Sequence, residues 1–379
     1  MITLRNFSDI CEIIRDARKK GASDIHISEA MPLWYRENGR LQAAELQPSP
    51  EEVRSLLLSL LSERHRAAFE AGEDADFSLE TPEGERQRVN VFRQQKKLAA
   101  TIRLLNGRIP SLEELKMPTT LYEMAKQPRG LILVTGPTGS GKSTTLAAMI
   151  EYLNRNLDRH VITIEDPIEY RYESKRSLIH QREVGEDVGS FASALRSALR
   201  EDPDVILVGE MRDYETISAA LLAAETGHLV LSTLHTNSTT ETLVRLQQMG
   251  VARWMISSAL SMVIAQRLVR RLCPYCRQEA SRHTELPRTL WPRPLPRWQP
   301  TGCDRCYHGF YGRVAIFEVL VIDDTLRQAI ASGASTEVIG SSARQAGMTS
   351  LFEHGCMAVE QGLTTLEELL RVLGMPDGC

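Results

Sequence analysis

The sequence predicts an α/β fold in which a mostly parallel sheet is covered by helices and is preceded by a smaller α/β domain. Two observations support this prediction. Four short apolar runs alternate with helical patterns, and a glycine-rich loop connects the first run to a helix. The runs are residues 131–134, 161–164, 205–208 and 229–232. Continuous apolar runs of this length are typical of parallel strands that are buried on both faces.

The length of 379 residues exceeds what one hydrophobic core usually serves, so two domains are expected. Residues 1–107 combine a helical pattern with short alternating strands such as residues 24–28, which predicts a small α/β domain. Residues 108–118 contain two prolines and are predicted to be a linker. Residues 119–379 are predicted to form the second domain.

The composition is that of a soluble globular protein, with 42% hydrophobic and 25% charged residues. The formal net charge of −4 gives no global reason to expect nucleic-acid binding. The N-terminus lacks a basic-then-apolar secretory signal, and the apolar runs are too short to span a membrane. We therefore expect a cytoplasmic protein whose contact with a membrane is peripheral and goes through partners.

The glycine-rich loop has the spacing of a phosphate-binding loop. It follows a predicted buried strand and opens a predicted helix, which is the context that this motif requires. Glycines let backbone N–H groups turn inward around phosphates, and the helix N-terminus adds partial positive charge. Lys142 is expected to reach the β- and γ-phosphates of ATP, and the Ser143 hydroxyl to bind Mg²⁺. The predicted nucleotide-binding residues are Gly136, Pro137, Thr138, Gly139, Ser140, Gly141, Lys142, Ser143 and Thr144.

Acidic residues follow two of the apolar runs, in residues 162–169 and 208–213. Such residues are often solvated loop charges, but the carboxyl ends of parallel strands are where ligand sites of α/β proteins lie. Carboxylates there could complete the magnesium shell and orient the attacking water. Two histidines, His228 and His235, bracket another run, and at least one is expected to sense the γ-phosphate or its neighbours.

Four of the seven cysteines form two Cys-x-x-Cys pairs, Cys273 with Cys276 and Cys303 with Cys306. Their thiolates have the composition of a structural zinc site. Redox chemistry is the alternative, although two pairs fit one tetrahedral ion and neither opens a helix after a strand. The intervening residues 282–300 contain five prolines and are predicted to lack regular secondary structure.

Four boxes of the sequence, taken in order, resemble the secretion ATPases that power type IV pili and type II secretion. The boxes are the phosphate loop and residues 162–169, 196–213 and 226–235. The resemblance implies a RecA-like core that hydrolyses ATP. By resemblance Glu169 is the general base and Glu210 manages magnesium and water, while His235 and His228 belong to the histidine boxes. The cysteine pairs add a zinc-binding insertion at residues 273–306, and the sequence pattern predicts a helical tail at residues 323–379.

The N-terminal domain is similar to the PAS-like domain of this family, through residues 21–27 and 88–93. The resemblance makes Arg88 and Arg103, and also Arg93, candidate arginine fingers. The alternative is that they are exposed strand arginines in weak surface pairs. A homohexamer is implied, with nucleotide between the core of one subunit and the N-terminal domain of the next, docked on an inner-membrane platform protein.

The resemblance leaves the direction of the motor open. The tetracysteine motif favours pilus assembly or type II secretion, because retraction ATPases of the family usually lack these cysteines. The short N-terminal region is more similar to retraction ATPases, so retraction is the alternative. Two further alternatives are a scaffold that binds ATP without hydrolysis and a nucleic-acid translocase, for which only one arginine-rich segment could serve. Its arginines are 267, 270, 271, 277, 282, 288, 293 and 297, near Trp291 and Trp298.

Overall fold

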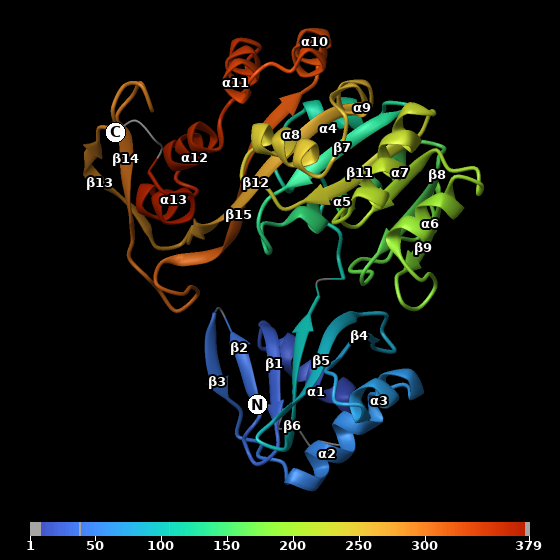
Figure 1. Ribbon diagram of the computed structural model, residues 1–379. Helices are drawn as coiled ribbons and strands as arrows, with labels where there is room; N and C mark the ends of the chain where they lie inside the picture. The colour runs from blue at the N-terminus through green and yellow to red at the C-terminus, as the bar shows by residue number, and fades with distance from the viewer. Residues whose placement is uncertain (1–8, 38, 106, 376–379) are drawn as a thin grey trace. The chain divides into compact units, whose positions relative to one another are not determined.

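The computed structural model describes residues 9–37, 39–105 and 107–375 and divides into two compact units (Figure 1). The first unit comprises the chain up to Arg108 together with Glu169–Arg171. The second comprises Ile109–Ile168 and the chain from Tyr172 onward. Leu112 and Met117, within the segment predicted as a linker, are buried in a core of the second unit.

In its described residues, the first unit is an antiparallel sheet with three helices. The strand order is β3-β2-β1-β6-β5-β4. The strands are β1 (Ala22–Ser28), β2 (Trp34–Glu37), β3 (Arg40–Ala43), β4 (Ala75–Glu80), β5 (Arg86–Gln94) and β6 (Lys97–Leu104), and the helices are α1 (Ile10–Lys19), α2 (Pro50–Ser59) and α3 (Glu63–Glu70). Alternate strand residues such as Ile25, Val89 and Ile102 pack with the helices in one core. Their neighbours along each strand, such as Asp24 beside Ile25, point to the opposite face because side chains alternate along a strand.

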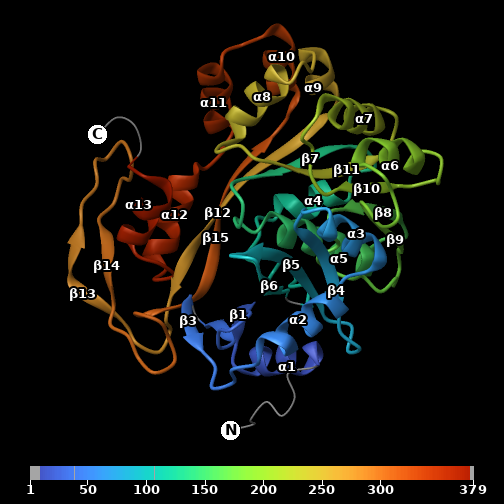
Figure 2. The same cartoon turned by 60° about the horizontal axis from the view of Figure 1, so that its bottom comes forward.

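The second unit is built on a seven-stranded sheet in the order β15-β12-β7-β11-β10-β8-β9 (Figure 2). Neighbouring strands are parallel except for the pair β12 and β15. The strands are β7 (Gly130–Thr135), β8 (His160–Glu165), β9 (Leu178–Glu183), β10 (Val205–Val208), β11 (Leu229–Leu234), β12 (Leu260–Leu272) and β15 (Phe310–Val321). The parallel-sheet α/β core that the apolar runs predict is therefore confirmed.

Helices cover both faces of this sheet because its central strands are predominantly apolar on both faces. On one face, strand residues share a core with α6 (Phe191–Ala198), α7 (Tyr214–Glu225), α8 (Thr239–Gln248), α9 (Arg253–Ala259), α10 (Asp324–Ser332) and α11 (Thr336–Gln345). On the other face they pack with α4 (Thr120–Ala125) and α5 (Lys142–Asn156). Every residue of β7, β10 and β11 is buried, as expected for parallel strands between two helical layers.

The last helices of the second unit pack against the long strands β12 and β15. A separate two-stranded sheet, β13 (Arg277–Thr284) and β14 (Leu295–Pro300), shares a small core with α12 (Leu351–Glu360) and α13 (Leu366–Leu373). The expectation that residues 282–300 lack regular structure is therefore wrong for residues 282–284 and 295–300, which lie in these strands, whereas residues 285–294 between them lie outside any helix or strand. Proline is tolerated here because each strand of a two-stranded sheet has a free edge, where no N–H donor is needed. Among the described residues, no helix is long and apolar enough to cross a membrane.

Candidate functional site

The glycine-rich loop lies between the end of β7 and the start of α5. Its glycines Gly136, Gly139 and Gly141 have φ angles of 148°, 80° and 88°. Only glycine adopts such angles without strain. Gly141 is the N-cap of α5 and has no side chain that could accept a hydrogen bond from the first turn. The backbone N–H groups of that turn can therefore donate to a bound anion.

The Lys142 side chain folds back into the loop. Its Nζ donates to the carbonyl oxygens of Gly136 at 2.8 Å and Pro137 at 3.1 Å. The residue is buried, so its ammonium charge is held by the loop rather than by bulk water. By contrast Pro137, Thr138, Gly139 and Ser143 are exposed, and Thr144 is half-buried. The loop thus presents backbone, a hydroxyl and one cation to the same side, a set of groups suited to phosphate and its magnesium ion.

Glu210 and His235 lie at the same edge of the sheet as the loop. The parallel register pairs Leu234 with Thr135, so His235 follows β11 where the loop follows β7. His235 Nε2 lies 3.8 Å from Glu210 Oε2, and Glu210 Oε1 lies 2.7 Å from Arg212 Nη2. The structure therefore brings three predicted elements together: the phosphate loop, Glu210 and His235.

The electrostatics of His235 agree with this position. Burial lowers the pKa of His235 below its usual range, and the positive charge of Lys142 lowers it further, while Glu210 acts in the opposite direction. The imidazole is thus favoured in its neutral form beside the loop. A neutral imidazole can both donate and accept a hydrogen bond, which suits a group that contacts phosphate or water.

The structure does not bring His228 to this edge. Gly130 N donates to His228 O, and His228 Nδ1 contacts Ala223 O at 3.0 Å, both at the start of β11. The six residues of β11 lie between His228 and His235, and the seven steps along the strand correspond to roughly 23 Å. The two histidines therefore lie at opposite ends of one strand, and of the pair only His235 lies beside the phosphate loop of its own chain. The place of His228 in the histidine boxes stays a prediction.

Glu169 and the candidate finger arginines belong to the first unit. Arg88 on β5 lies directly opposite Arg103 on β6, and their side chains are 44% and 63% exposed. Arg88 Nη1 lies 3.5 Å from Glu169 Oε1, and Arg103 Nε lies 3.0 Å from Asp24 Oδ1. Arg93 differs from both, because it donates to Phe69 O at 2.6 Å and stacks on the Phe69 ring.

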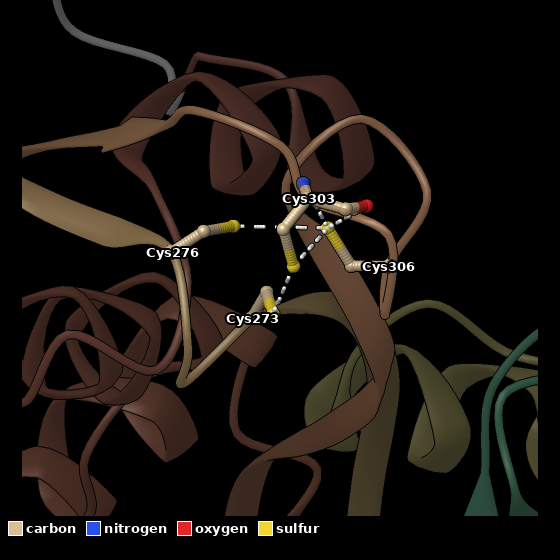
Figure 3. Close-up of side chains that lie close together, drawn as sticks. All are labelled: Cys273, Cys276, Cys303 and Cys306. Carbon is tan, nitrogen blue, oxygen red and sulfur yellow. Dashed lines mark hydrogen bonds between the residues drawn. The ribbon is translucent and has the colours of Figure 1, made fainter.

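The four cysteines form one cluster at the ends of β12 and β15 (Figure 3). Three Sγ–Sγ distances are 3.8 Å (Cys273–Cys303), 3.7 Å (Cys276–Cys306) and 3.6 Å (Cys303–Cys306). A disulfide requires about 2.05 Å, so the thiols are not paired covalently. Zn–S bonds of about 2.3 Å in tetrahedral geometry place sulfurs about 3.8 Å apart. The spacing of the cluster therefore fits one zinc ion.

Sequence reasoning missed Gln266, which contacts the phosphate loop, and assigned no site role to its neighbour Arg267. Both lie on β12, beside β7, and are 2% and 8% exposed. A signal was available in the chain, because two consecutive polar residues follow the apolar run 262–265. Buried polar side chains need hydrogen-bond partners, so they mark a position where something polar lies opposite.

Comparison with known proteins places these features in context. A family model described as "Type II/IV secretion system protein" matches residues 6–371. The "Protein transport protein HofB homolog" of Escherichia coli is 46% identical over 377 residues, covering 96% of this chain and 81% of its own. The type II secretion system ATPase E of Vibrio cholerae is 38% identical over 380 residues, covering 95% and 74%. The crystal structure of the pilus retraction motor PilT with bound ADP matches with a TM-score of 0.81 and 38% identity over 97% of both chains.

Proposed function

The chain belongs to the type II/IV secretion system protein family, and from this premise we propose that it is the motor of a hexameric ring that powers type IV pilus assembly or type II secretion. As a member of the family it is an ATP hydrolase. The observation that carries the proposal is the meeting of the phosphate loop, Glu210 and His235 at one edge of the sheet. A scaffold that binds ATP without hydrolysing it would not need the Glu210 carboxylate and the His235 imidazole beside the phosphate loop.

The roles of the site residues follow from their chemistry. The loop amides receive the phosphates of ATP, and Lys142 exchanges its carbonyl partners for phosphate oxygens. The Ser143 hydroxyl would hold Mg²⁺, which neutralises phosphate charge when bound. Glu210 orients water and the magnesium shell. Glu169 serves as general base, a role that rests on its place in the acidic box that resembles the family.

Arg88 and Arg103 are proposed to reach the nucleotide of a neighbouring subunit. The two residues lie directly opposite each other on neighbouring strands, and their side chains are 44% and 63% exposed although each is near a carboxylate, so both guanidinium groups remain accessible to an anion. Arginines donated across a subunit interface would couple hydrolysis to motion, because loss of the γ-phosphate removes their charge partner. Arg93 does not fit this role, since its guanidinium is held against Phe69.

We further infer that the first unit is a PAS-like domain, that the second has a RecA-like core, and that the ring associates peripherally with the inner membrane through a platform protein. The antiparallel sheet with helices packed in one core supports the PAS-like assignment. The tetracysteine cluster favours assembly or secretion over retraction. Deletion of the gene in its own organism separates the two: loss of surface pili or of secretion supports assembly or secretion, whereas pili that no longer retract support retraction.

Zn²⁺ is proposed to occupy the tetracysteine cluster as a structural ion, because four thiolates leave no open position for catalysis. It would hold together the turns at which β12 ends and β15 begins, next to the proline-rich strands. Metal analysis of the purified protein should return about one zinc per chain. A metal-free protein of unchanged stability would contradict the assignment.

The contacts of the arginine-rich segment favour a motor for protein subunits over a nucleic-acid translocase. Arg270 binds Glu368, Arg293 binds Glu360, and Arg277 donates to Gly362 O. Of the two tryptophans, Trp291 is buried and Trp298 donates its indole N–H to Val359 O. Side chains held in this way do not form a stacking platform for bases.

The proposal is tested by measuring the ATPase rate per chain against protein concentration, with and without single-stranded DNA. For a ring motor that acts on protein, the rate should rise with concentration and ignore DNA. Lys142→Ala should abolish it, and Glu210→Gln should reduce it by at least about 100-fold, the scale of one lost catalytic group. Strong stimulation by DNA would favour the translocase, and a wild-type rate for Glu210→Gln would refute the assigned site.

A further inference from the structure

The amide of Gln266 on β12 joins two parts of the nucleotide loop. Its Nε2 donates to Ser140 O at 2.7 Å, and its Oε1 accepts from Thr145 Oγ1 at 2.7 Å. Gln266 and Thr145 are 2% and 1% exposed, so both hydrogen bonds are shielded from water. One side chain therefore connects the last part of the loop to the first turn of α5.

The loop is also packed tightly on Gln266. A Cβ atom built at Gly136 would lie 2.5 Å from Gln266 O, and one built at Gly141 would lie 2.7 Å from Gln266 Nε2. At Gly136 the backbone leaves no room for a side chain, and at Gly141 a side chain would displace the Gln266 amide from its hydrogen bonds. The first and last glycines of the motif thus permit close approach to β12 as well as the unusual φ angles of the loop.

The next residue, Arg267, holds the second loop of the site. Its Nη2 donates to the backbone O and to Oδ1 of Asn237 at 3.1 Å and 3.0 Å, and its Nη1 donates to Gln266 O at 2.9 Å. Asn237 is two residues beyond His235. Adjacent residues of one strand therefore fasten the phosphate loop and the loop that follows His235. These three hydrogen bonds to oxygen acceptors offset part of the cost of burying the guanidinium.

We propose that Gln266 and Arg267 are positioning residues, which hold the phosphate loop and the His235 loop in the arrangement that binds nucleotide. A loop that is already ordered avoids the entropic cost of ordering when the ligand binds. Contacts between the loop and the phosphates exist in the bound substrate as well as in the transition state. Loss of the Gln266 contacts should therefore raise KM and the Kd for ADP more than it lowers kcat. The inference rests on the proposed nucleotide site.

The test compares Gln266→Leu, which removes both hydrogen bonds at similar volume, with two changes at Thr145. Thr145→Val removes the donor to Gln266 Oε1, and Thr145→Ser keeps it. We expect Gln266→Leu to weaken binding of a fluorescent ADP analogue and to raise KM by about tenfold or more, with kcat changed by less than about threefold. Thr145→Val should weaken binding by about three- to tenfold, and Thr145→Ser should bind within about twofold of wild type.

Thr364→Val is the matched control, because Thr364 is a buried threonine whose hydroxyl donates to Arg270 O on the same strand, away from the loop. It should bind the ADP analogue like wild type. Unchanged binding in both Gln266→Leu and Thr145→Val would overturn the inference. If Gln266→Leu fails to fold, the Thr145 pair alone decides. Lys142→Ala distinguishes failure of the positioning role from failure of the nucleotide site. If Lys142→Ala also binds the ADP analogue normally, the proposed nucleotide site is wrong. If Lys142→Ala loses binding while Gln266→Leu and Thr145→Val keep it, only the positioning role is wrong.

Discussion

Glu368→Gln tests how the helical tail is fastened to the sheet. Glu368 on α13 has a fully buried side chain that accepts hydrogen bonds from two arginines. Its two oxygens receive Arg270 N, Nε and Nη2 at 2.9, 3.0 and 2.8 Å, and Arg371 Nε and Nη2 at 2.7 Å each. Burial opposes ionisation, but the hydrogen bonds from Arg371 and Arg270 outweigh it and lower the pKa of Glu368 from 4.5 to about 2.

The magnitude follows from that pKa. A fall from 4.5 to about 2 corresponds to at most about 3 kcal/mol. The side chains of Arg270 and Arg371 are 42% and 59% exposed, so water screens part of the interaction. Glutamine keeps the size of the side chain and loses its charge. We therefore expect Glu368→Gln to lower the free energy of unfolding of the second unit by about 2 kcal/mol.

The assay is urea unfolding followed by tryptophan fluorescence, because Trp291 and Trp298 pack in the same core as α13. Glu367→Gln is the control: Glu367 is 67% exposed and lies 4.0 Å from Arg297, so its loss should cost less than about 0.5 kcal/mol. The folded-state pKa of Glu368 is lowered, so its stabilisation is complete above pH 4.5 and is lost as the pH falls towards 2. Equal stability of the two variants at pH 7 would refute the reasoning.

Three other predictions concern the nucleotide site and the cysteine cluster. Gly136→Ala should lose ADP binding by at least about tenfold, because φ is 148° and the new Cβ would meet Gln266 O at 2.5 Å, whereas Gly189→Ala, with open space, should bind normally. The acid limb of kcat/KM, which reports the nucleotide-free enzyme, should lie below pH 6.5 where it depends on His235, since the pKa of His235 is lowered; it should disappear in His235→Asn, and a limb above 6.5 would contradict the account. Cys273→Ser should lower the zinc content measured by metal analysis and the melting temperature together, and a zinc content unchanged from wild type would show that this thiol is not a ligand.

The sequence alone determined those features whose chemistry is local. The phosphate loop is recognisable because its function requires glycine φ angles, a lysine and a hydroxyl within nine consecutive residues, 136–144. The parallel strands are recognisable because burial on both faces demands continuous apolar runs. The tetracysteine cluster is also local in part, since each Cys-x-x-Cys pair lies in one turn. In each case the information lies within a short stretch of chain.

Tertiary structure decided the features that depend on which distant segments meet. His228 and His235 look equivalent in the sequence, but the direction and register of β11 place only His235 beside the phosphate loop. Gln266 lies more than a hundred residues from Ser140, and Glu368 lies almost as far from Arg270, so no local pattern links either pair. A polar residue beside an apolar run indicates, from the sequence alone, a side chain that needs a hydrogen-bond partner. Only the packing of the strands and helices shows which partner it has, because hydrogen bonds form between groups that the fold brings within reach.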